Sequence, residues 1–332
     1  MKQRLADNIS VVARSPGLDA NSIEVVITTP TFRRPDHLLK TLESLRAQET
    51  ARPYALVVME NEAKAREGAK AAAPLFESGH FHGFLIVAHD RGNCNAYNAG
   101  WLTALVAFPA MRHLLVIDDD EIAGPDWIER MVSTAEAYDA AFVGGPQRPV
   151  FEDGGVEKWR NHPVFRAHYD TTGPVPILYS SGNLLVSRRV LEVMPQPFMD
   201  LRFNFMGGGD SDLMHRARKK GFTFAWCEEA PVFETIPGRR VSWNWIQARA
   251  MRNGVISALV HKRDRGGDGG GFDPIVFAKS LALLGLSPLR FVGGLTKGET
   301  FLGALNPVLV ALGRVLSEFG YANEQYRAPE KN

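Results

Sequence analysis

The chain has 332 residues, of which 45% are hydrophobic and 23% charged, so it can form one large or two ordinary folded domains, and a disordered or fibrous protein is excluded. Its 38 Lys and Arg balance 37 Asp and Glu, which excludes a global field that attracts nucleic acid. Only Cys94 and Cys227 are cysteines, so a disulfide framework is excluded and a reducing compartment is indicated. Residues 1–17 hold no apolar run of signal-peptide length, and we expect a cytoplasmic protein without nucleic-acid partners.

Short runs of apolar and β-branched residues recur along the first part of the chain. They cover residues 23–28, 54–59, 84–88 and 114–117. Their spacing of about 30 residues is typical of alternating strands and helices, and Pro35 opens a predicted helix over 35–48. The sequence therefore predicts an α/β fold with a mostly parallel sheet flanked by helices. Such sheets bind ligands beyond the carboxyl ends of their strands.

After residue 140 the alternation becomes less regular. Strands are expected at 141–144, 184–186 and 222–227, and helices at 211–220 and 243–262. Five glycines between residues 263 and 274 indicate a flexible linker. We predict one α/β domain over 1–262, a Gly-rich linker over 263–274 and an amphipathic helical C-terminal region over 275–332.

The most informative motif is an acidic run directly after the apolar run 114–117. Asp118, Asp119, Asp120 and Glu121 would repel one another at the end of a buried strand unless a cation sits among them. Aspartates two positions apart can share one divalent ion, so Asp118 and Asp120 are candidate ligands of Mg²⁺ or Mn²⁺. The alternative is a solvated acidic turn that caps the next helix.

A second acidic cluster, Asp210 and Asp212, follows the glycines at 207–209 and precedes a basic segment. Glycines let the backbone approach a ligand closely, and burial of a carboxylate raises its pKa towards that of a general base. Asp210 is therefore a candidate base, with an ordinary helix cap as the alternative. Arg249 and Arg252 share one face of a predicted helix and could reach a phosphate group, or else lie on the surface.

Several motifs occur in a fixed order between residues 27 and 254. They are Thr28 to Pro35, Glu60-Asn61, Gly92 with Ala96, Asn98 and Gly100, Asp118 to Glu121 with Asp126-Trp127-Ile128, Gly182-Asn183, Gly209 to Leu213, and Trp245 with Arg249, Arg252 and Gly254. Together they resemble the motifs of inverting family 2 glycosyltransferases with the GT-A fold. Within that family, the chain more closely resembles the bacterial succinoglycan-type exopolysaccharide glucosyltransferases. The resemblance identifies the predicted domain over 1–262 as a GT-A glycosyltransferase domain.

This resemblance implies roles for particular residues. The residues expected to bind the donor nucleotide sugar are Thr29, Pro30, Thr31, Arg33, Glu60, Asn61, Gly92, Asn98, Asp118, Asp119, Gly182, Asn183, Arg249 and Arg252. A divalent cation would be held by Asp120 and Asp118 with Glu234, and Asp210 would be the catalytic base. The residues expected at the acceptor are Trp127, Asp212 and Trp245.

The preferred interpretation is a metal-dependent inverting enzyme that moves a hexose from a UDP-linked sugar to a glycan or lipid-linked oligosaccharide in bacterial polysaccharide biosynthesis. One alternative, a sugar-phosphate nucleotidyltransferase, needs a Gly-rich phosphate loop that residues 29–33 lack. The other is a non-catalytic nucleotide-sugar binder. It is motivated by Gly209 and Phe233, which stand where the family has Glu and His. The family also often has Arg where Tyr97 stands, which weakens one expected phosphate contact.

The C-terminal region keeps its apolar content after the motifs end. Phe277, Leu281 and Leu284 recur at helical spacing, and we expect Pro288 to end that helix. The uncharged stretches are shorter than a membrane-spanning helix needs. Either this apolar stripe packs on the catalytic domain or on a second subunit, or it lies on the inner face of an anionic membrane and brings the site to a lipid-linked acceptor.

Overall fold

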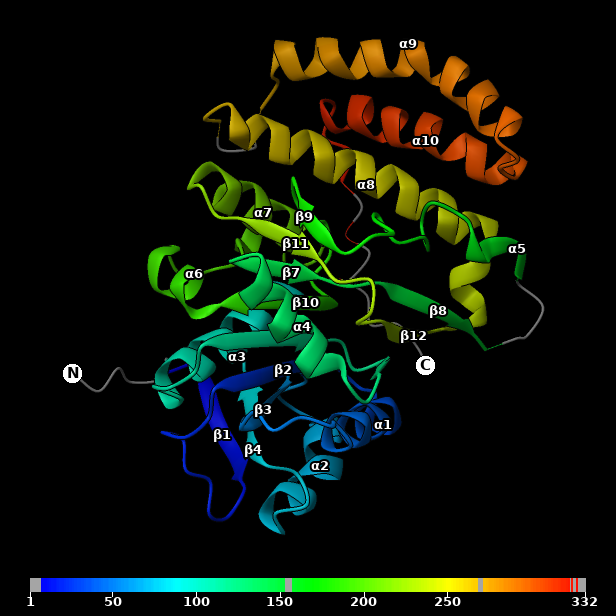
Figure 1. Ribbon diagram of the computed structural model, residues 1–332. Helices are drawn as coiled ribbons and strands as arrows, with labels where there is room; N and C mark the ends of the chain where they lie inside the picture. Colours follow the sequence, from blue (N-terminus) through cyan, green and yellow to red (C-terminus); the bar gives the residue numbers. More distant parts are fainter. Residues whose placement is uncertain (1–6, 153–156, 268–270, 323, 325–326, 328–332) are drawn as a thin grey trace.

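The computed structural model describes residues 7–152, 157–267 and 271–322, together with Glu324 and Arg327. Three residues of the predicted linker, 268–270, and most of the segment after 322 lie outside this part of the chain. Within the described residues, a nine-stranded sheet in the order β1-β4-β3-β2-β5-β10-β7-β11-β9 forms the centre of the molecule (Figure 1). Its strands are β1 (Ile9–Arg14), β2 (Val25–Thr31), β3 (Tyr54–Glu60), β4 (Gly83–Ala88), β5 (His113–Ile117), β7 (Phe142–Gly144), β9 (Gly173–Val175), β10 (Asn183–Ser187) and β11 (Phe224–Trp226).

The sheet is mostly parallel, as predicted. Strands β4, β3, β2 and β5 pair in parallel, and β7 and β11 run in the same direction as these four. Strands β1, β9 and β10 are antiparallel to their neighbours. The carboxyl ends of the parallel strands therefore meet at one edge, where ligands of such sheets bind.

Both faces of the sheet are buried, which explains why its strands read as continuous apolar runs. Alternate residues of a strand point to opposite faces, so Val26 packs in one core and Ile27 in the other. The first core is closed by α3 (Asn93–Ala107), α6 (Arg188–Val193) and α7 (Gly209–Lys219). The second is closed by α1 (Pro35–Arg46), α2 (Glu67–Glu77) and α4 (Trp127–Ala137).

A smaller sheet in the order β6-β12-β8 lies beside the acidic run. Its strands are β6 (Glu121–Ala123), β8 (Gln147–Phe151) and β12 (Val232–Ile236). Strand β12 pairs antiparallel with β6, so that Glu234 lies opposite Glu121. The N–H of Thr235 also donates to the carbonyl of Asp120 at 2.9 Å. This sheet therefore brings Glu234 to the acidic strand end across more than a hundred residues of sequence.

Beyond the sheets, short helices α5 (Glu157–Arg160), η1 (Leu201–Phe203) and η2 (Gly238–Val241) precede three long helices. These are α8 (Trp243–Asp264), α9 (Pro274–Thr296) and α10 (Phe301–Ser317). In Figure 1, α10 lies between α8 and an outer α9. Helix α9 continues through Pro288, so the expectation that this proline ends the helix was wrong. Proline has no N–H to donate to the Leu284 carbonyl four residues earlier. The Ser287 hydroxyl donates to that carbonyl instead, at 2.7 Å.

Helix α10 packs directly on α8 through glycines. A Cβ added at Gly254 of α8 would lie 2.1 Å from the Val310 carbonyl oxygen. One added at Gly313 of α10 would lie 2.1 Å from the Met251 carbonyl oxygen. The two backbones are therefore in contact, and for α10 the packing explanation of the apolar tail is the correct one.

Helix α9 differs from α10 because much of its apolar surface is exposed. Leu286, Leu289 and Val292 are all at least half exposed. Among the described helices, α9 is long and apolar enough to cross a membrane by length and composition, with a mean hydropathy of 1.6 and 17% of that stretch buried. The uncharged runs alone did not predict this, because Lys279 and Arg290 interrupt them.

The contact at Gly254 predicts a defined loss of stability. Gly254→Ala should lower the free energy of unfolding by about 1 to 3 kcal/mol, because the added methyl group meets backbone atoms that cannot move aside. Gly285→Ala is the matched control, since no atom lies within 4 Å of its added Cβ, and it should be neutral or slightly stabilising. Denaturant unfolding followed by circular dichroism measures both. Equal stability of the two variants would contradict the direct packing of α10 on α8.

Candidate active site

A cavity of about 760 Å³ opens at the carboxyl ends of the parallel strands and extends along α8. Most of the residues predicted from the sequence line it. These are Pro30, Thr31, Asn61, Gly92, Asp118, Asp119, Asp120, Gly182, Asn183, Asp210, Glu234, Trp245, Arg249 and Arg252. The predicted location of the site at this edge of the sheet is therefore where the structure has its cavity.

Other predicted site residues lie behind the cavity wall and hold it in shape. Both carboxylate oxygens of Glu60 accept backbone hydrogen bonds, from the N–H groups of Glu62 at 2.8 Å and Ala69 at 2.9 Å. Arg33 pairs with Glu62 at 2.5 Å. The Asn98 amide makes two hydrogen bonds of 2.8 Å with the backbone of Met199. Each of these side chains fixes a loop that borders the cavity.

Trp127, Asp212 and Thr29 are also buried away from the cavity. The Trp127 indole N–H donates at 2.9 Å to Asn183 Oδ1, so Trp127 orients a cavity residue. Asp212 accepts from Arg216 at 2.7 Å and also pairs with Arg263. In this structure Trp127 and Asp212 act on neighbouring side chains, whereas Trp245 of the predicted acceptor group lines the cavity.

Arginines surround the acidic strand end. Arg34 donates to Asp120 at 2.7 Å and to Asp119 at 3.3 Å. Arg240 lies 3.6 Å from Asp120 and 3.2 Å from Glu234. These cations offset part of the negative charge that the acidic run concentrates at the cavity.

The carboxylates nevertheless remain poorly compensated. Burial, together with the neighbouring Asp120 carboxylate, raises the pKa of Asp118 to about 6 and that of Glu234 to about 7. Burial and the same neighbour raise the pKa of Asp119 to about 7, although Arg34 opposes this. Tyr97, which stands where the resembled family often has Arg, donates its hydroxyl to Asp118 Oδ1 at 2.5 Å.

The donor set fits a divalent cation that arrives with phosphate oxygens. Among the described residues, no group of three or more His, Cys, Asp or Glu side chains is arranged to hold a metal by itself. Mg²⁺ and its relatives, however, commonly take one or two carboxylates and complete their shell with substrate phosphates and water. Asp118 and Asp120 both line the cavity and supply such carboxylates, with raised pKa values at Asp118 and at the neighbouring Glu234.

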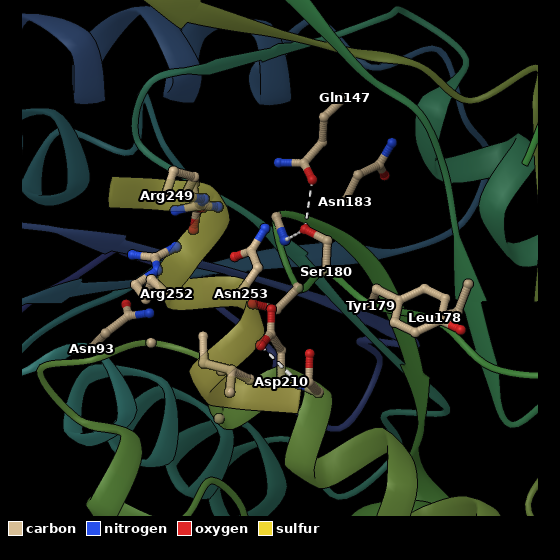
Figure 2. A pocket seen from close by; sticks show the side chains of 18 of the residues that line it. Asn93, Gln147, Leu178, Tyr179, Ser180, Asn183, Asp210, Arg249, Arg252 and Asn253 are labelled. Atoms are coloured by element: carbon tan, nitrogen blue, oxygen red, sulfur yellow. Dashed lines mark hydrogen bonds between the residues drawn. The ribbon is translucent and has the colours of Figure 1, made fainter. Parts of the chain in front are cut away.

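Asp210 lies across the cavity from the acidic strand end, at the first turn of α7. The chain enters this helix through Gly207 and Gly208, whose φ values are +83° and +94°. A Cβ at Gly208 would lie 2.5 Å from Ile256 of α8, so glycine allows α7 to approach α8. Figure 2 shows Asp210 facing the cavity beside Asn253, with Arg252 and Arg249 on the same wall.

The environment of Asp210 suits a proton acceptor. Burial raises the pKa of its carboxyl group, while the Ser211 N–H, Arg249 and Arg252 pull that pKa back. The Ser211 N–H donates to one carboxylate oxygen at 2.8 Å. The other oxygen is available to a hydroxyl group in the cavity. A raised pKa makes the Asp210 carboxylate a better proton acceptor than an exposed one.

The structure adds site residues that the sequence did not identify. Gln147 donates to Glu121 at 2.5 Å and accepts from the Ser180 hydroxyl at 2.6 Å, on the wall opposite Arg249 (Figure 2). The sequence analysis named Arg33 as a donor-binding residue, whereas the neighbouring Arg34 is the one that lines the cavity. Arg240 belongs to none of the sequence motifs, and only the structure shows its ion pair with Glu234.

The mostly parallel sheet flanked by helices, with a cavity at the carboxyl ends of its strands, is the architecture of GT-A glycosyltransferases. Residues 26–194 match the Glycosyl transferase family 2 domain, which covers half of the chain, and the chain belongs to that family. The protein is therefore a glycosyltransferase, and this match favours it over the nucleotidyltransferase alternative.

Two relatives illustrate this membership. The chain is 28% identical over 236 residues to the succinoglycan biosynthesis protein ExoM of Rhizobium meliloti (strain 1021), covering 70% of this chain and 74% of that protein. Its fold is similar to that of the mannosyltransferase PcManGT from Pyrobaculum calidifontis, solved in complex with GDP-Man and Mn²⁺. That similarity has a TM-score of 0.58 at 14% identity and covers 93% of this chain and 89% of the other.

Proposed function

We propose that this glycosyltransferase is metal-dependent and inverting, and that it transfers a hexose from a UDP-linked sugar to a glycan or lipid-linked oligosaccharide in bacterial polysaccharide biosynthesis. The observation that carries the proposal is the placement of Asp210 in one cavity with the acidic strand end and with Arg249 and Arg252. The similarity to a succinoglycan biosynthesis protein supports the polysaccharide pathway.

The donor diphosphate would lie between α8 and the acidic strand end. Departure of a nucleoside diphosphate leaves negative charge that must be neutralised within the cavity. Arg249 and Arg252 supply two fixed positive charges on one helical face. A divalent cation held by Asp118 and Asp120 would supply further neutralisation of the diphosphate.

The nucleotide would extend towards the end of β3. Asn61 lines the cavity there, and its Oδ1 accepts from the Gly92 N–H at 2.7 Å while its amide donates to the Asp90 carbonyl at 2.8 Å. A Cβ at Gly92 would lie 2.0 Å from the Asn204 amide nitrogen, so glycine is required at this φ of +126°. The loop is thus preorganised as one wall of a base and ribose pocket.

Asp210 would act on the acceptor. Its free carboxylate oxygen accepts the proton of the acceptor hydroxyl as that oxygen forms a bond to the anomeric carbon. The bond from that carbon to the diphosphate breaks on the opposite face, so the configuration inverts in one displacement. Asn183, oriented by Trp127, and Gly182 would border the sugar on the side of β10.

We further propose that the enzyme is cytoplasmic and touches the inner face of the membrane through α9. Its exposed surface combines Leu289 and Val292 with the basic side chain of Arg290. An amphipathic helix of this kind can lie in the membrane interface. This placement would bring the cavity to a lipid-linked acceptor.

The donor is tested by a thermal-shift screen of nucleotide sugars with Mn²⁺ or Mg²⁺. A UDP-hexose at about 100 times its Kd should stabilise the protein by about 2.7 kcal/mol, and less when EDTA replaces the cation. Release of UDP in the presence of an acceptor glycan separates catalysis from mere binding. A protein that no nucleotide sugar stabilises would contradict the proposal.

A further inference from the structure

The cavity does not end at the donor site but continues along α8 to the C-terminal helices. Ser257 and His261 of α8 and Arg314 of α10 line this far end. His261 lies nine positions beyond Arg252, which is about 14 Å along a helix axis. This end is therefore separate from the groups assigned to the donor diphosphate.

Two basic side chains, His261 and Arg314, line this end, and the exposed Lys279 reaches His261 from the surface. Lys279 Nζ of α9 lies 3.3 Å from His261 Nε2, and Arg314 Nη2 of α10 lies 3.3 Å from His261 Nδ1. Arg314 Nη1 also donates to the Ser257 hydroxyl. Helices α9 and α10 thus place two full positive charges beside the two ring nitrogens of one imidazole on α8.

Glu318 offsets part of the Arg314 charge through space, but no carboxylate of the described residues pairs with Arg314 directly. Arg314 is only 6% exposed, forms no ion pair with any carboxylate of the described chain, and its Nε has no hydrogen-bond partner. The nearby carboxylates are engaged elsewhere, since Glu318 pairs with Lys262 at 2.9 Å and Asp264 pairs with Lys219 at 3.2 Å. Lys262 and Arg314 thus share one carboxylate, and a buried cation that is only partly compensated is stabilised when an anion joins it.

The surroundings of this cluster are apolar on the outer side. Ile275, one turn before Lys279 on the same face of α9, is 44% exposed, and Leu286 further along that face is 50% exposed. A ligand that fits would therefore carry an anionic group next to an alkyl chain. A glycan attached to the same anionic group could follow α8 towards Asp210.

We propose that His261, Lys279 and Arg314 bind the diphosphate of an amphiphilic acceptor, with its glycan directed to Asp210 and its alkyl chain leaving over α9. This inference rests on the glycosyltransferase function proposed above. It assigns to the C-terminal helices a direct part in acceptor choice, beyond their packing on α8.

The test is calorimetric titration of the full chain, saturated with UDP and Mg²⁺, with inorganic pyrophosphate and with dodecyl diphosphate below its micelle concentration. Both probes should bind the wild type, and dodecyl diphosphate should bind more tightly. Lys279→Gln and Arg314→Gln should each weaken binding by about tenfold, with UDP affinity unchanged. Lys297→Gln is the matched control, because it removes one exposed lysine charge at the C-terminal end of the same helix, outside the cluster, and it should bind like the wild type.

The outcomes separate the parts of the proposal. Failure of both probes to bind the UDP-loaded wild type, or unchanged binding in Lys279→Gln, overturns the anion site. Lys279 is exposed, so this variant remains decisive even if Arg314→Gln does not fold. Equal affinity for the two probes assigns the site to a soluble phosphate compound and overturns the amphiphilic acceptor. A wild type that does not bind UDP contradicts the proposed function itself.

Discussion

Asp210→Asn should reduce turnover by about 10² or more while the affinity for the nucleotide stays unchanged, as expected for the loss of a general base. The substitution keeps the shape of the side chain and its place at the start of α7, so the hydrogen bond from Ser211 can remain. It removes the oxygen that would take the acceptor proton. Steady-state UDP release with an acceptor measures turnover, and calorimetry measures UDP affinity.

The pH profile adds a second readout for Asp210. Because burial raises the pKa of its carboxyl group, the wild-type rate should fall as the pH drops through that pKa, and the variant should lose the part of the acid limb that Asp210 contributes. Asp139→Asn is the matched control, since Asp139 is exposed outside the cavity and has a φ of +43°, which Asn tolerates. Turnover of Asp210→Asn close to that of this control would remove Asp210 from the role of base.

Removal of the divalent cation should have a comparable effect. EDTA, or Asp120→Ala in the presence of Mn²⁺, should reduce transfer by about 10² or more, because metal neutralisation of a leaving diphosphate is worth several kcal/mol. Donor affinity should fall as well. Adding back Mn²⁺ should restore the chelated wild type and leave Asp120→Ala inactive.

The arginines at the acidic strand end provide the competing explanation. Arg34 and Arg240 lie within 4 Å of Asp120, and Arg249 and Arg252 line the same cavity. Full activity in EDTA would mean that guanidinium groups neutralise the diphosphate without an ion. Arg34→Gln then becomes the informative variant, since it should impair a metal-free enzyme more than a metal-dependent one.

The sheet was predictable where burial on both faces leaves a continuous apolar run. Strands β2 to β5 and the helix after β2 lie close to their expected ranges, because apolar periodicity and Pro35 report local preferences. Strands β1, β8, β9 and β12 were not identified. Strand β8 carries arginine and proline with partly exposed residues, and its pairing partner β12 is far away in the sequence, so no local signal marks it.

The residues of the candidate site likewise fall into those that local sequence predicts and those that depend on tertiary contacts. Residues at strand ends, such as Asp118 and Asn61, were predictable because a parallel sheet gathers those ends at one edge. Arg240, Gln147 and Arg314 were not, because their positions depend on the small sheet and on the return of α10. Pro288 shows a different limit, since a serine hydroxyl one residue earlier offsets the effect of the proline. The division into domains stays a prediction.

The backbone contact between Gly254 and Val310 couples α8 and α10, so that we expect the two helices to move as one rigid body. With no side chains between the two helices at that point, neither can slide or tilt without the other. Arg249 and Arg252 belong to α8. Any change in the angle of the C-terminal helices would therefore move these two arginines relative to Asp118 on the sheet. The width of the cavity therefore depends on the orientation of the C-terminal helices. Because α9 packs on α10, a contact that fixes α9 would also fix the distance between the α8 arginines and Asp118.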